Sequence, residues 1–347
     1  MWRKLTALAL SALILASLTS CSGMAESVQE LLPSTTVEET ADTASDENTA
    51  VEEETASDSV QAQTVGSTET YTLSGKLTES LVIDTDNAVE ITLNNVTAEL
   101  TDTVIRIKNA KSVTLILVGD STLTSTAADT KTISSDVDLV IEGNGTLTVN
   151  SADTCIKADT DLTVNSGTLV LNAGSEGDGL RSDETLTING GTISIEAGEG
   201  LESTQITIND GTISITASDD GINGSQKSET LTPVVTINGG NISITMAQGD
   251  TDAIDCNGNI VITGGTINIS GPSAFDADGN ISYTGGTVYW NGQLQSSISN
   301  SMMGGGMMGG MPGQQGGWGN QGNTGEAPSG GAWGGQQPSG GPSGMHP

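Results

Sequence analysis

Acidic residues recur at one turn of a sequence phrase that repeats along the chain. The column comprises Asp153, Asp178, Glu199, Asp219, Asp220, Asp250, Asp252, Asp255, Asp276 and Asp278. If successive repeats stack, neighbouring carboxylates lie about 4.8 Å apart and repel one another unless a cation separates them. Ca²⁺ accepts six to eight oxygen ligands in irregular geometry, whereas Mg²⁺ demands a near-ideal octahedron. The pattern therefore favours Ca²⁺ as cofactor, although Asp and Gly are also ordinary residues of tight turns.

A second column follows the apolar residue that comes after each acidic turn, and its charge changes from basic to acidic along the chain. It runs through Lys157, Arg181, Glu202, Asn223, Asp255 and Asp276. If the apolar residues point inward, these side chains point outward. We therefore treat the first four as carbohydrate-binding candidates, with Lys157 and Arg181 gripping a sugar carboxylate; a solvated polar face is the alternative. The insertion at 225–233 is expected to form a lip beside Asp219 and Asp220.

The elements that must position these residues are short strands. A typical copy reads LTINGGTISIEAGEGLEST at 186–204, and nine copies begin 20 to 29 residues apart. Apolar residues alternate on either side of the N-G-G corner, and Leu201, Ile222, Ile254 and Phe275 mark a third strand. The sequence predicts an all-β, right-handed parallel β-helix (a solenoid) of about nine coils. A leucine-rich repeat is the alternative, but its L-x-x-L-x-L-x-x-N phrase is absent.

Stacked coils place like residues in ladders, so two ladders are expected at the corner of the repeat. One consists of asparagines and the other of glycines: Asn165, Asn189, Asn209 and Asn238, and Gly167, Gly191, Gly211, Gly240, Gly265 and Gly286. The ends of the solenoid need caps, because a terminal coil leaves strand edges unpaired. We expect Trp290 to serve as a capping residue.

The composition of the two chain ends separates them from the repeats. Residues 1–20 predict a lipoprotein signal peptide, and Cys21 ends a lipobox at which lipid can be attached. Residues 21–69 predict a disordered stalk, since the 12 acidic residues in 26–69 have no Lys or Arg beside them. Residues 299–347, rich in Gly, Met, Gln and Pro, predict a disordered tail. The repeat domain spans 70–298, and the protein is expected to be lipid-anchored on the extracellular face of the cell membrane.

The charge and the cysteines limit the partners and the crosslinks. A net charge of −33 excludes nucleic acid, which needs clustered Lys and Arg, and the absence of His from the repeats argues against zinc. Cys155 and Cys256 occupy equivalent turns four repeats apart, roughly 19 Å at 4.8 Å per strand. Because a disulfide requires Cα atoms within about 7 Å, we expect both thiols to be free.

The chain resembles the carbohydrate-binding, calcium-binding β-helix family of bacterial cell-surface proteins, related in fold to pectate-lyase-like polysaccharide lyases. The N-G-G-T-I-x-I phrase, the D-G-I/L and D-A-I-D turns, the lipobox and the Gly/Met-rich tail carry the resemblance. It implies several bound calcium ions and binding of cellulose or acidic polysaccharide. Carried over by motif, the calcium candidates are Asp178, Glu199, Asp220, Asp252, Asp255, Asp276 and Asp278, with Asp219 beside Asp220.

Three functions compete on this evidence. The leading hypothesis is a monomeric surface lipoprotein that binds plant or cell-wall polysaccharide, uronate-containing rather than crystalline cellulose because exposed aromatics are few. The second is a calcium-dependent polysaccharide lyase with Lys131, Lys157 or Arg181 as base. The third is a structural adhesin or wall spacer. No local motif marks one of the three basic residues as catalytic, so no catalytic residue is assigned.

Overall fold

The computed structural model describes residues 59–248 and 251–300. The chain divides into two units, Met1–Gly305 and Gly306–Pro347, and all described residues belong to the first. The predicted signal peptide, Cys21, Asp250, most of the stalk and nearly all of the tail lie outside the described residues. Within them, no helix is long and apolar enough to cross a membrane.

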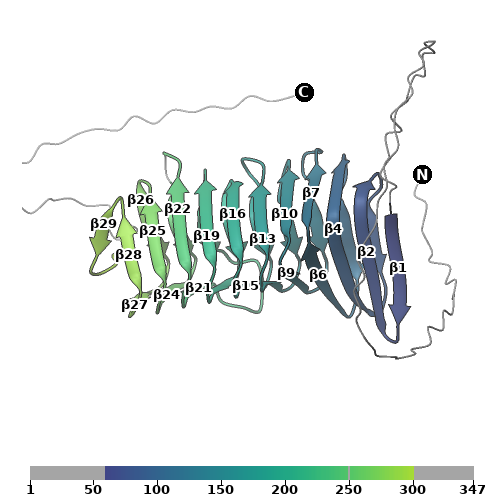
Figure 1. Ribbon diagram of the computed structural model, residues 1–347. Coiled ribbons are helices and arrows are strands. Elements are labelled where there is room, and N and C mark those ends of the chain that lie inside the picture. The colour runs from purple at the N-terminus through teal and green to yellow at the C-terminus, as the bar shows by residue number, and fades with distance from the viewer. Residues whose placement is uncertain (1–58, 249–250, 301–347) are drawn as a thin grey trace, which may run out of the picture. The chain divides into compact units, whose positions relative to one another are not determined.

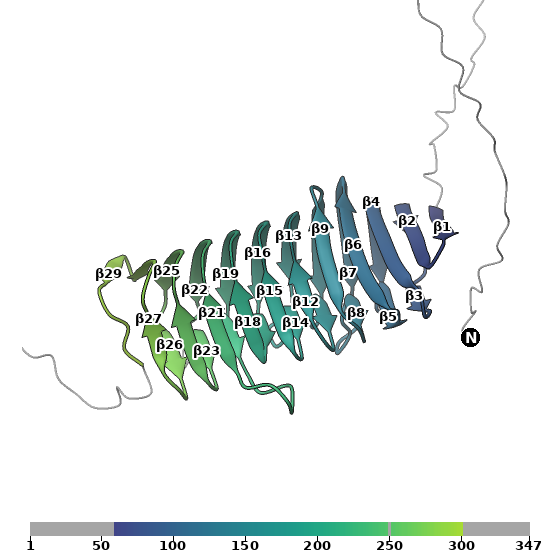
Figure 2. The same cartoon turned by 90° about the horizontal axis from the view of Figure 1, so that it is seen from below.

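The described chain forms a parallel β-solenoid of about nine turns, which confirms the predicted all-β fold (Figures 1 and 2). Its strands form a long sheet of 20 strands and a short sheet of nine. Each central turn gives two strands to the long sheet, separated by a corner, and one strand to the short sheet. The three-strand repeat expected from the sequence is therefore present.

The long sheet consists of two columns of strands and the strands that join or cap them. Strands β2 (Thr68–Leu77) and β4 (Ala88–Leu100) run through both columns, and β1 (Ser59–Val65) and β29 (Gln293–Gln295) cap them. The first column is β6 (Ser112–Val118), β9 (Leu139–Gly143), β12 (Leu162–Val164), β15 (Thr185–Ile188), β18 (Gln205–Ile208), β21 (Val234–Ile237), β24 (Asn259–Ile262) and β27 (Ile281–Tyr283). The second is β7 (Asp120–Ser125), β10 (Thr146–Ser151), β13 (Thr168–Asn172), β16 (Thr192–Ala197), β19 (Thr212–Ala217), β22 (Asn241–Met246), β25 (Thr266–Ser270) and β28 (Thr287–Trp290).

The short sheet carries the residues that follow the acidic turns. It consists of β3 (Leu81–Asp84), β5 (Ile105–Asn109), β8 (Ile133–Ser135), β11 (Ile156–Ala158), β14 (Asp178–Ser182), β17 (Glu199–Ser203), β20 (Ile222–Gly224), β23 (Asp252–Cys256) and β26 (Ser273–Ala277). The predicted marker residues pair in register from Leu201 to Ile222, Ile254 and Phe275, and all four are buried.

Alternating side chains build a continuous apolar core along the solenoid. In β16 every second residue is buried, so Ile193 and Ile195 point inward while Thr192 and Ser194 are exposed. Register pairing places equivalent apolar residues above one another in Leu169, Ile193, Ile213, Ile242, Ile267 and Val288. Because each turn buries its apolar residues against the next turn, no single turn has a complete core.

The corner between the two long-sheet columns contains both predicted ladders. Asn189, Asn209 and Asn238 each donate a side-chain hydrogen bond to the asparagine one turn before, at 3.0, 2.8 and 2.9 Å. The corner glycines have positive φ, for example +82° at Gly265. A Cβ at Gly265 would lie 2.7 Å from the Gly239 carbonyl oxygen of the preceding turn, so the ladder requires glycine.

Both ends of the long sheet are closed by antiparallel strands. β1 pairs with β2 and β29 pairs with β28, so these antiparallel strands cover the terminal edges of β2 and β28. Trp290 packs partly buried against the core in this last coil, as expected of a capping residue. At the end of the short sheet the Asn300 side chain accepts from the Ala277 N–H and donates to the Ala277 carbonyl.

Strand β1 and the start of β2 correct the predicted domain boundary, because residues 59–69 were assigned to the disordered stalk. Val60 and Val65 are 50% and 62% exposed, so β1 buries little apolar surface. Its order comes from main-chain pairing with β2 through a turn in which Gly66 has φ of +64°. A strand that is ordered by main-chain hydrogen bonds alone cannot be predicted from the hydrophobic pattern of its sequence.

Cys155 and Cys256 are both free and buried, which confirms that they do not pair. Burial raises the pKa of the Cys155 thiol to about 12 and that of Cys256 to about 11. Both are therefore protonated, unreactive core residues at neutral pH.

We predict that Gly265→Ala destabilises the protein by about 1–3 kcal/mol, because alanine adds both a strained positive φ and a clash with the previous turn. Gly292→Ala is the matched control: its φ is +75°, but a Cβ there meets nothing within 4 Å. Urea unfolding of both variants measures the difference. Equal losses of stability in the two variants would show that the close contact between successive corners does not contribute to the free energy of unfolding.

Candidate functional site

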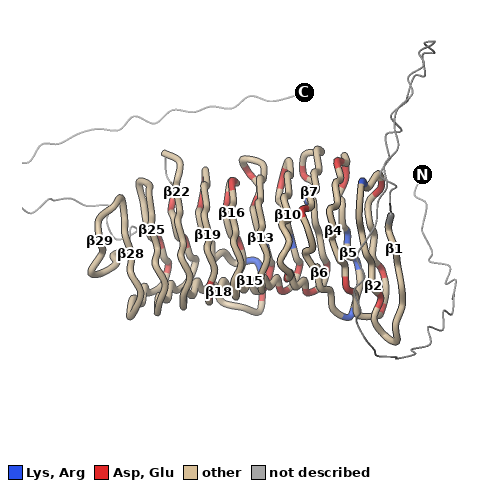
Figure 3. Tube along the Cα trace, viewed as in Figure 1, with Lys and Arg blue, Asp and Glu red and all other residues tan. Residues whose placement is uncertain are grey.

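The acidic turns lie together along one edge of the short sheet. Asp178 begins β14 and Glu199 begins β17, and the two residues pair in register. Asp220 precedes β20, and Asp252 begins β23. The expected stacking is therefore present. Acidic residues recur along the stack, whereas no Lys or Arg follows Lys227 in the sequence (Figure 3).

The first acidic group comprises Asp178, Glu199 and Glu202, whose side-chain oxygens lie within 4.8 Å of one another. Asp178 and Glu202 are only 4% and 3% exposed. Three acidic residues in this arrangement could hold a metal ion. Burial, and then the charge of Glu202, raise the pKa of Asp178, which Arg181 and Thr154 partly offset.

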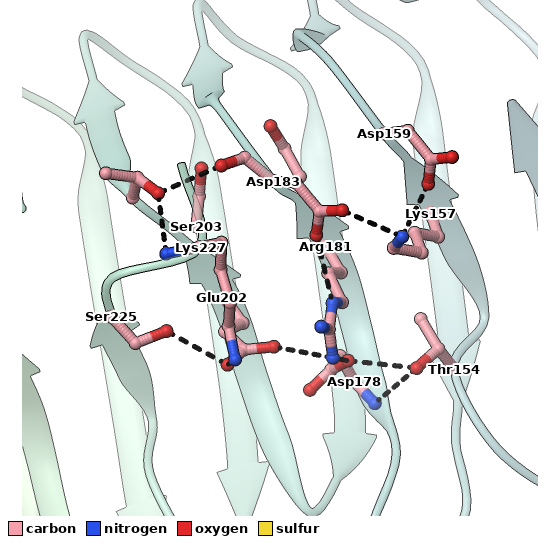
Figure 4. A network of polar contacts seen from close by, with 12 residues as sticks. Thr154, Lys157, Asp159, Asp178, Arg181, Asp183, Glu202, Ser203, Ser225 and Lys227 are labelled. Atoms are coloured by element: carbon pink, nitrogen blue, oxygen red, sulfur yellow. Dashed lines mark hydrogen bonds and ion pairs between the residues drawn. The ribbon is translucent and has the colours of Figure 1, made fainter. Parts of the chain in front are cut away.

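Two cationic side chains already lie against this first group (Figure 4). The Arg181 guanidinium contacts Glu202 at 2.9 Å and Asp178 at 3.4 Å. The Lys227 ammonium forms an ion pair with the other oxygen of Glu202. Burial opposes the charge on Arg181, but these carboxylates and Asp183 outweigh it and raise its pKa. Most of the charge of the first group is thus compensated from within the chain.

The second predicted column is in register, but two of its members are not exposed as expected. Lys157, Arg181, Glu202, Asn223, Asp255 and Asp276 are successive partners in the short sheet. Glu202 and Asn223 are buried. The prediction that they point into solvent was wrong for these two positions, and Asn223 donates instead to Glu199 at 3.1 Å.

The insertion at 225–233 explains the burial of Glu202. Ser225 donates to Glu202 at 3.0 Å, and the main-chain N–H groups of Lys227 and Ser228 donate to the Thr204 hydroxyl at 3.0 and 2.8 Å. The predicted lip therefore closes over Glu202 and Thr204, rather than standing beside Asp219 and Asp220. The position of this lip could not be predicted from the repeat pattern, since the insertion has no equivalent in the other repeats.

The basic residues that sequence analysis offered as ligands or bases are all held by carboxylates of this chain. Lys157 contacts Asp159 and Asp183, the latter at 2.9 Å, and Lys131 contacts Asp153 at 2.6 Å. Burial disfavours the charged Lys157, yet its hydrogen bonds to both partners outweigh burial and raise its pKa. Such a lysine stays protonated at neutral pH.

The second acidic group comprises Asp219, Asp220, Asp252, Asp255, Asp276 and Asp278. Burial, and repulsion by Asp255, Asp219 and Asp252, raise the pKa of Asp220 to about 7 against a hydrogen bond from the Asp252 N–H. Burial, and then Asp276 and Asp252, raise the pKa of Asp255 to about 6. These carboxyls are therefore close enough to oppose each other's ionisation. Asp219 and Asp278 at the margins are exposed.

Glu199 belongs to the first group but is also repelled by Asp220 of the second, and its pKa is strongly raised. Burial, followed by Glu202, Asp178 and Asp220, raises its pKa to about 8. The repulsion from both sides shows that the two groups form one electrostatic row. In the first group, Arg181 and Lys227 offset the repulsion among the carboxylates. The sequence has no Lys or Arg beyond Lys227 that could do the same for the second group.

Hard oxygen donors without His suit Ca²⁺ better than zinc, so the residues present fit the predicted metal class. Among the described residues, the three-carboxylate cluster close enough to hold one ion is the first group, but two cations already lie against it. The second group is less buried than the first, and the sequence has no Lys or Arg beyond Lys227.

Comparisons with known proteins gave a similar solved structure and a family match. The chain is similar to the solved structure of a polysaccharide lyase-like protein from C. thermocellum, a gadolinium derivative: 23% identity, 65% of this chain and 92% of that chain covered, and a TM-score of 0.45. None of the curated proteins matches. Residues 58–293 match the family described as carbohydrate-binding domain-containing proteins, and the chain belongs to this family.

Proposed function

We propose that this protein binds acidic, uronate-containing polysaccharide through Ca²⁺ held by the second acidic group, without cleaving it. One observation carries the proposal: the carboxylates from Asp220 to Asp276 follow one edge of the short sheet, and the sequence has no Lys or Arg beyond Lys227, which pairs with Glu202 of the first group. Membership of a carbohydrate-binding family supports a sugar polymer as the partner.

The negative charge of the protein is the reason that an acidic ligand requires a metal. The net charge of −33 repels a polyuronate, so recognition requires a local change of sign. Ca²⁺ accepts six to eight oxygens, and side-chain carboxylates on one edge of the solenoid leave positions for carboxylates of the sugar. Lys157 and Arg181 are engaged by Asp159, Asp178, Asp183 and Glu202, so the cation is the stronger candidate for contact with the ligand.

The ion pairs also favour binding over lysis. A lyase needs a base that gives up its proton near neutral pH. Lys131, Lys157 and Arg181, the candidate bases, all contact carboxylates, and the pKa values of Lys157 and Arg181 are raised rather than lowered. This is the opposite of the shift that general-base catalysis requires.

The surface location is part of the proposal. Cys21 follows a short apolar segment and the polar residues of a lipobox. Lipid attached there would hold the solenoid at the outer face of the cell membrane, where polysaccharide is accessible.

We predict that metal-free protein loses stability as pH rises from about 5 to 8. Folding raises the pKa values of Glu199, Asp220 and Asp255 above their unfolded values near 4, so the folded state binds more protons throughout this window. Its free energy of unfolding therefore falls as pH rises through the folded pKa values, by about 1–3 kcal/mol after allowance for solvent screening. Urea unfolding in chelator measures this trend.

The variant Asp220→Asn should flatten that pH dependence, by about 1 kcal/mol over the same range, since it removes one of the shifted groups. Excess Ca²⁺ at pH 8 should restore the stability that the chelated protein lacks. A metal-free protein that becomes more stable between pH 5 and 8 would contradict the electrostatic account of the row.

We predict that Ca²⁺ stabilises the protein by about 2.7 kcal/mol at 100 times its dissociation constant, and that it is required for binding polygalacturonate. Asp220→Asn combined with Asp255→Asn should remove most of both effects. Thermal melts and a pull-down with insoluble polygalacturonate measure them. Glu90→Gln, which changes an exposed carboxylate on β4, is the matched control and should behave as wild type.

Two outcomes would contradict this proposal. Equal pull-down with calcium and with chelator would remove the metal from recognition. Release of unsaturated, ultraviolet-absorbing products that Lys157→Ala abolishes would establish the lyase instead.

We predict that Cys21→Ala moves the protein from the membrane fraction to the medium, because a single apolar signal segment is removed after export and no lipid replaces it. Cell fractionation with an immunoblot measures the distribution. Ser22→Ala is the control and should leave membrane retention unchanged. Membrane retention of Cys21→Ala would exclude a lipid on this residue as the anchor.

A further inference from the structure

The C-terminal end of the solenoid contains a hollow that the acidic row does not use. It lies between β26, β28 and the chain that follows β29, and its volume is about 350 Å³. This is at the small end of ligand pockets, which span roughly 300–1,000 Å³. Pro272, Phe275, Trp290, Gln295, Ser297 and Asn300 are among its lining residues.

The lining combines aromatic surface with uncharged hydrogen-bonding groups. Phe275 is the only Phe of the chain, and Trp290 is the only Trp among the described residues. Gln295 and Ser297 line the same hollow, and none of the described lining residues is charged. Phe275 is only 3% exposed, so the partly exposed Trp290 supplies the aromatic surface. An aromatic ring beside amides and hydroxyls complements a ligand that has apolar faces and a rim of hydroxyl groups. An uncharged sugar has this chemistry.

A second, more open hollow adjoins the first across Pro272. Thr245, Gln248 and Asn291 contribute to its wall. The ridge between the two hollows is fixed, because Trp290 and Asn291 both donate to the Gly271 carbonyl at 3.1 and 2.9 Å. Asn291 also accepts from the Gly271 N–H at 3.1 Å. The pair of hollows thus forms a short uncharged groove over a rigid ridge.

The groove adjoins the end of the acidic row. Ser273, which lines the first hollow, donates a hydrogen bond to Asp252 of the second acidic group. A polymer lying along the row therefore meets the groove at the last turn. The change from acidic to uncharged lining also changes the class of sugar that each part favours.

We propose that this end groove binds an uncharged sugar unit, independently of metal, as a second subsite beside the acidic row. The inference rests on the proposed polysaccharide-binding function, but the subsite differs from that function in ligand charge and in metal dependence.

Fluorescence of Trp290 tests the subsite directly. In the full chain carrying Trp2→Phe, Trp318→Phe and Trp333→Phe, Trp290 is the only tryptophan. We expect at least one of four uncharged hexasaccharides, from β-glucan, xylan, mannan and galactan, to shift its emission to saturation, equally in calcium and in chelator. No shift with any of the four overturns the proposal.

Two variants in this background separate the groove from general effects. Gln295→Ala removes a lining amide and should weaken the titrated affinity about tenfold, whereas Leu294→Ala, at an exposed neighbour outside the lining, should leave it unchanged. Equal affinities for the two variants would overturn the assignment. Asp220→Asn with Asp255→Asn should abolish polygalacturonate binding yet leave the Trp290 titration intact, so failure of either site is recognised separately. Loss of the Trp290 response in that double variant would contradict an independent subsite.

Discussion

In-register stacking of parallel strands is the constraint on which the rest of this structure depends. It places each residue about one strand spacing from its equivalent in the next turn, so a residue type that recurs at one position of the repeat forms a ladder. For isoleucine the result is a dry core, and for asparagine it is a chain of side-chain amide bonds such as Asn189 to Asn165. For aspartate and glutamate the same geometry places like charges together, which is unfavourable. The acidic edge of the short sheet is therefore a ladder that stacking alone would destabilise.

The two halves of that edge meet the electrostatic cost differently. Around Glu202 the chain supplies its own cations, Arg181 from the neighbouring turn and Lys227 from the insertion. Beyond Lys227 the sequence supplies no Lys or Arg, and in the second group the cost is expressed as raised pKa values at Asp220 and Asp255. A cation from solution compensates such a site only while the carboxyls are ionised. Metal affinity, protonation and stability are thus coupled through the same few residues.

Periodicity explains which parts of this arrangement could be predicted from the sequence. Leu201, Ile222, Ile254 and Phe275 each follow the acidic turn at the same place in successive repeats, so the third strand and its register followed from the repeated phrase although the repeats differ in length. The positions of Glu202 and Lys227 could not be predicted in this way, because the insertion at 225–233 is unique and its path depends on hydrogen bonds to Thr204. One signal was present: Lys227, the last basic residue, lies inside the only long insertion. Strand β1 was missed for a different reason, since it is ordered by main-chain pairing with little apolar burial.

The same stacking explains how the solenoid ends. The last strand of each stack has no next turn to pair with, so its free edge needs a partner of another kind. At β28 the antiparallel strand β29 supplies one, and at β26 the Asn300 amide replaces a tenth strand. A side chain covers less of an edge than a strand does, so the space beside Phe275 and Trp290 is not filled by a further turn. In the proposed function the acidic row takes up a cation because its carboxylates repeat, whereas the end groove has an uncharged lining because it lies where the repeat stops. Two kinds of sugar recognition can therefore coexist on one solenoid without sharing a residue type.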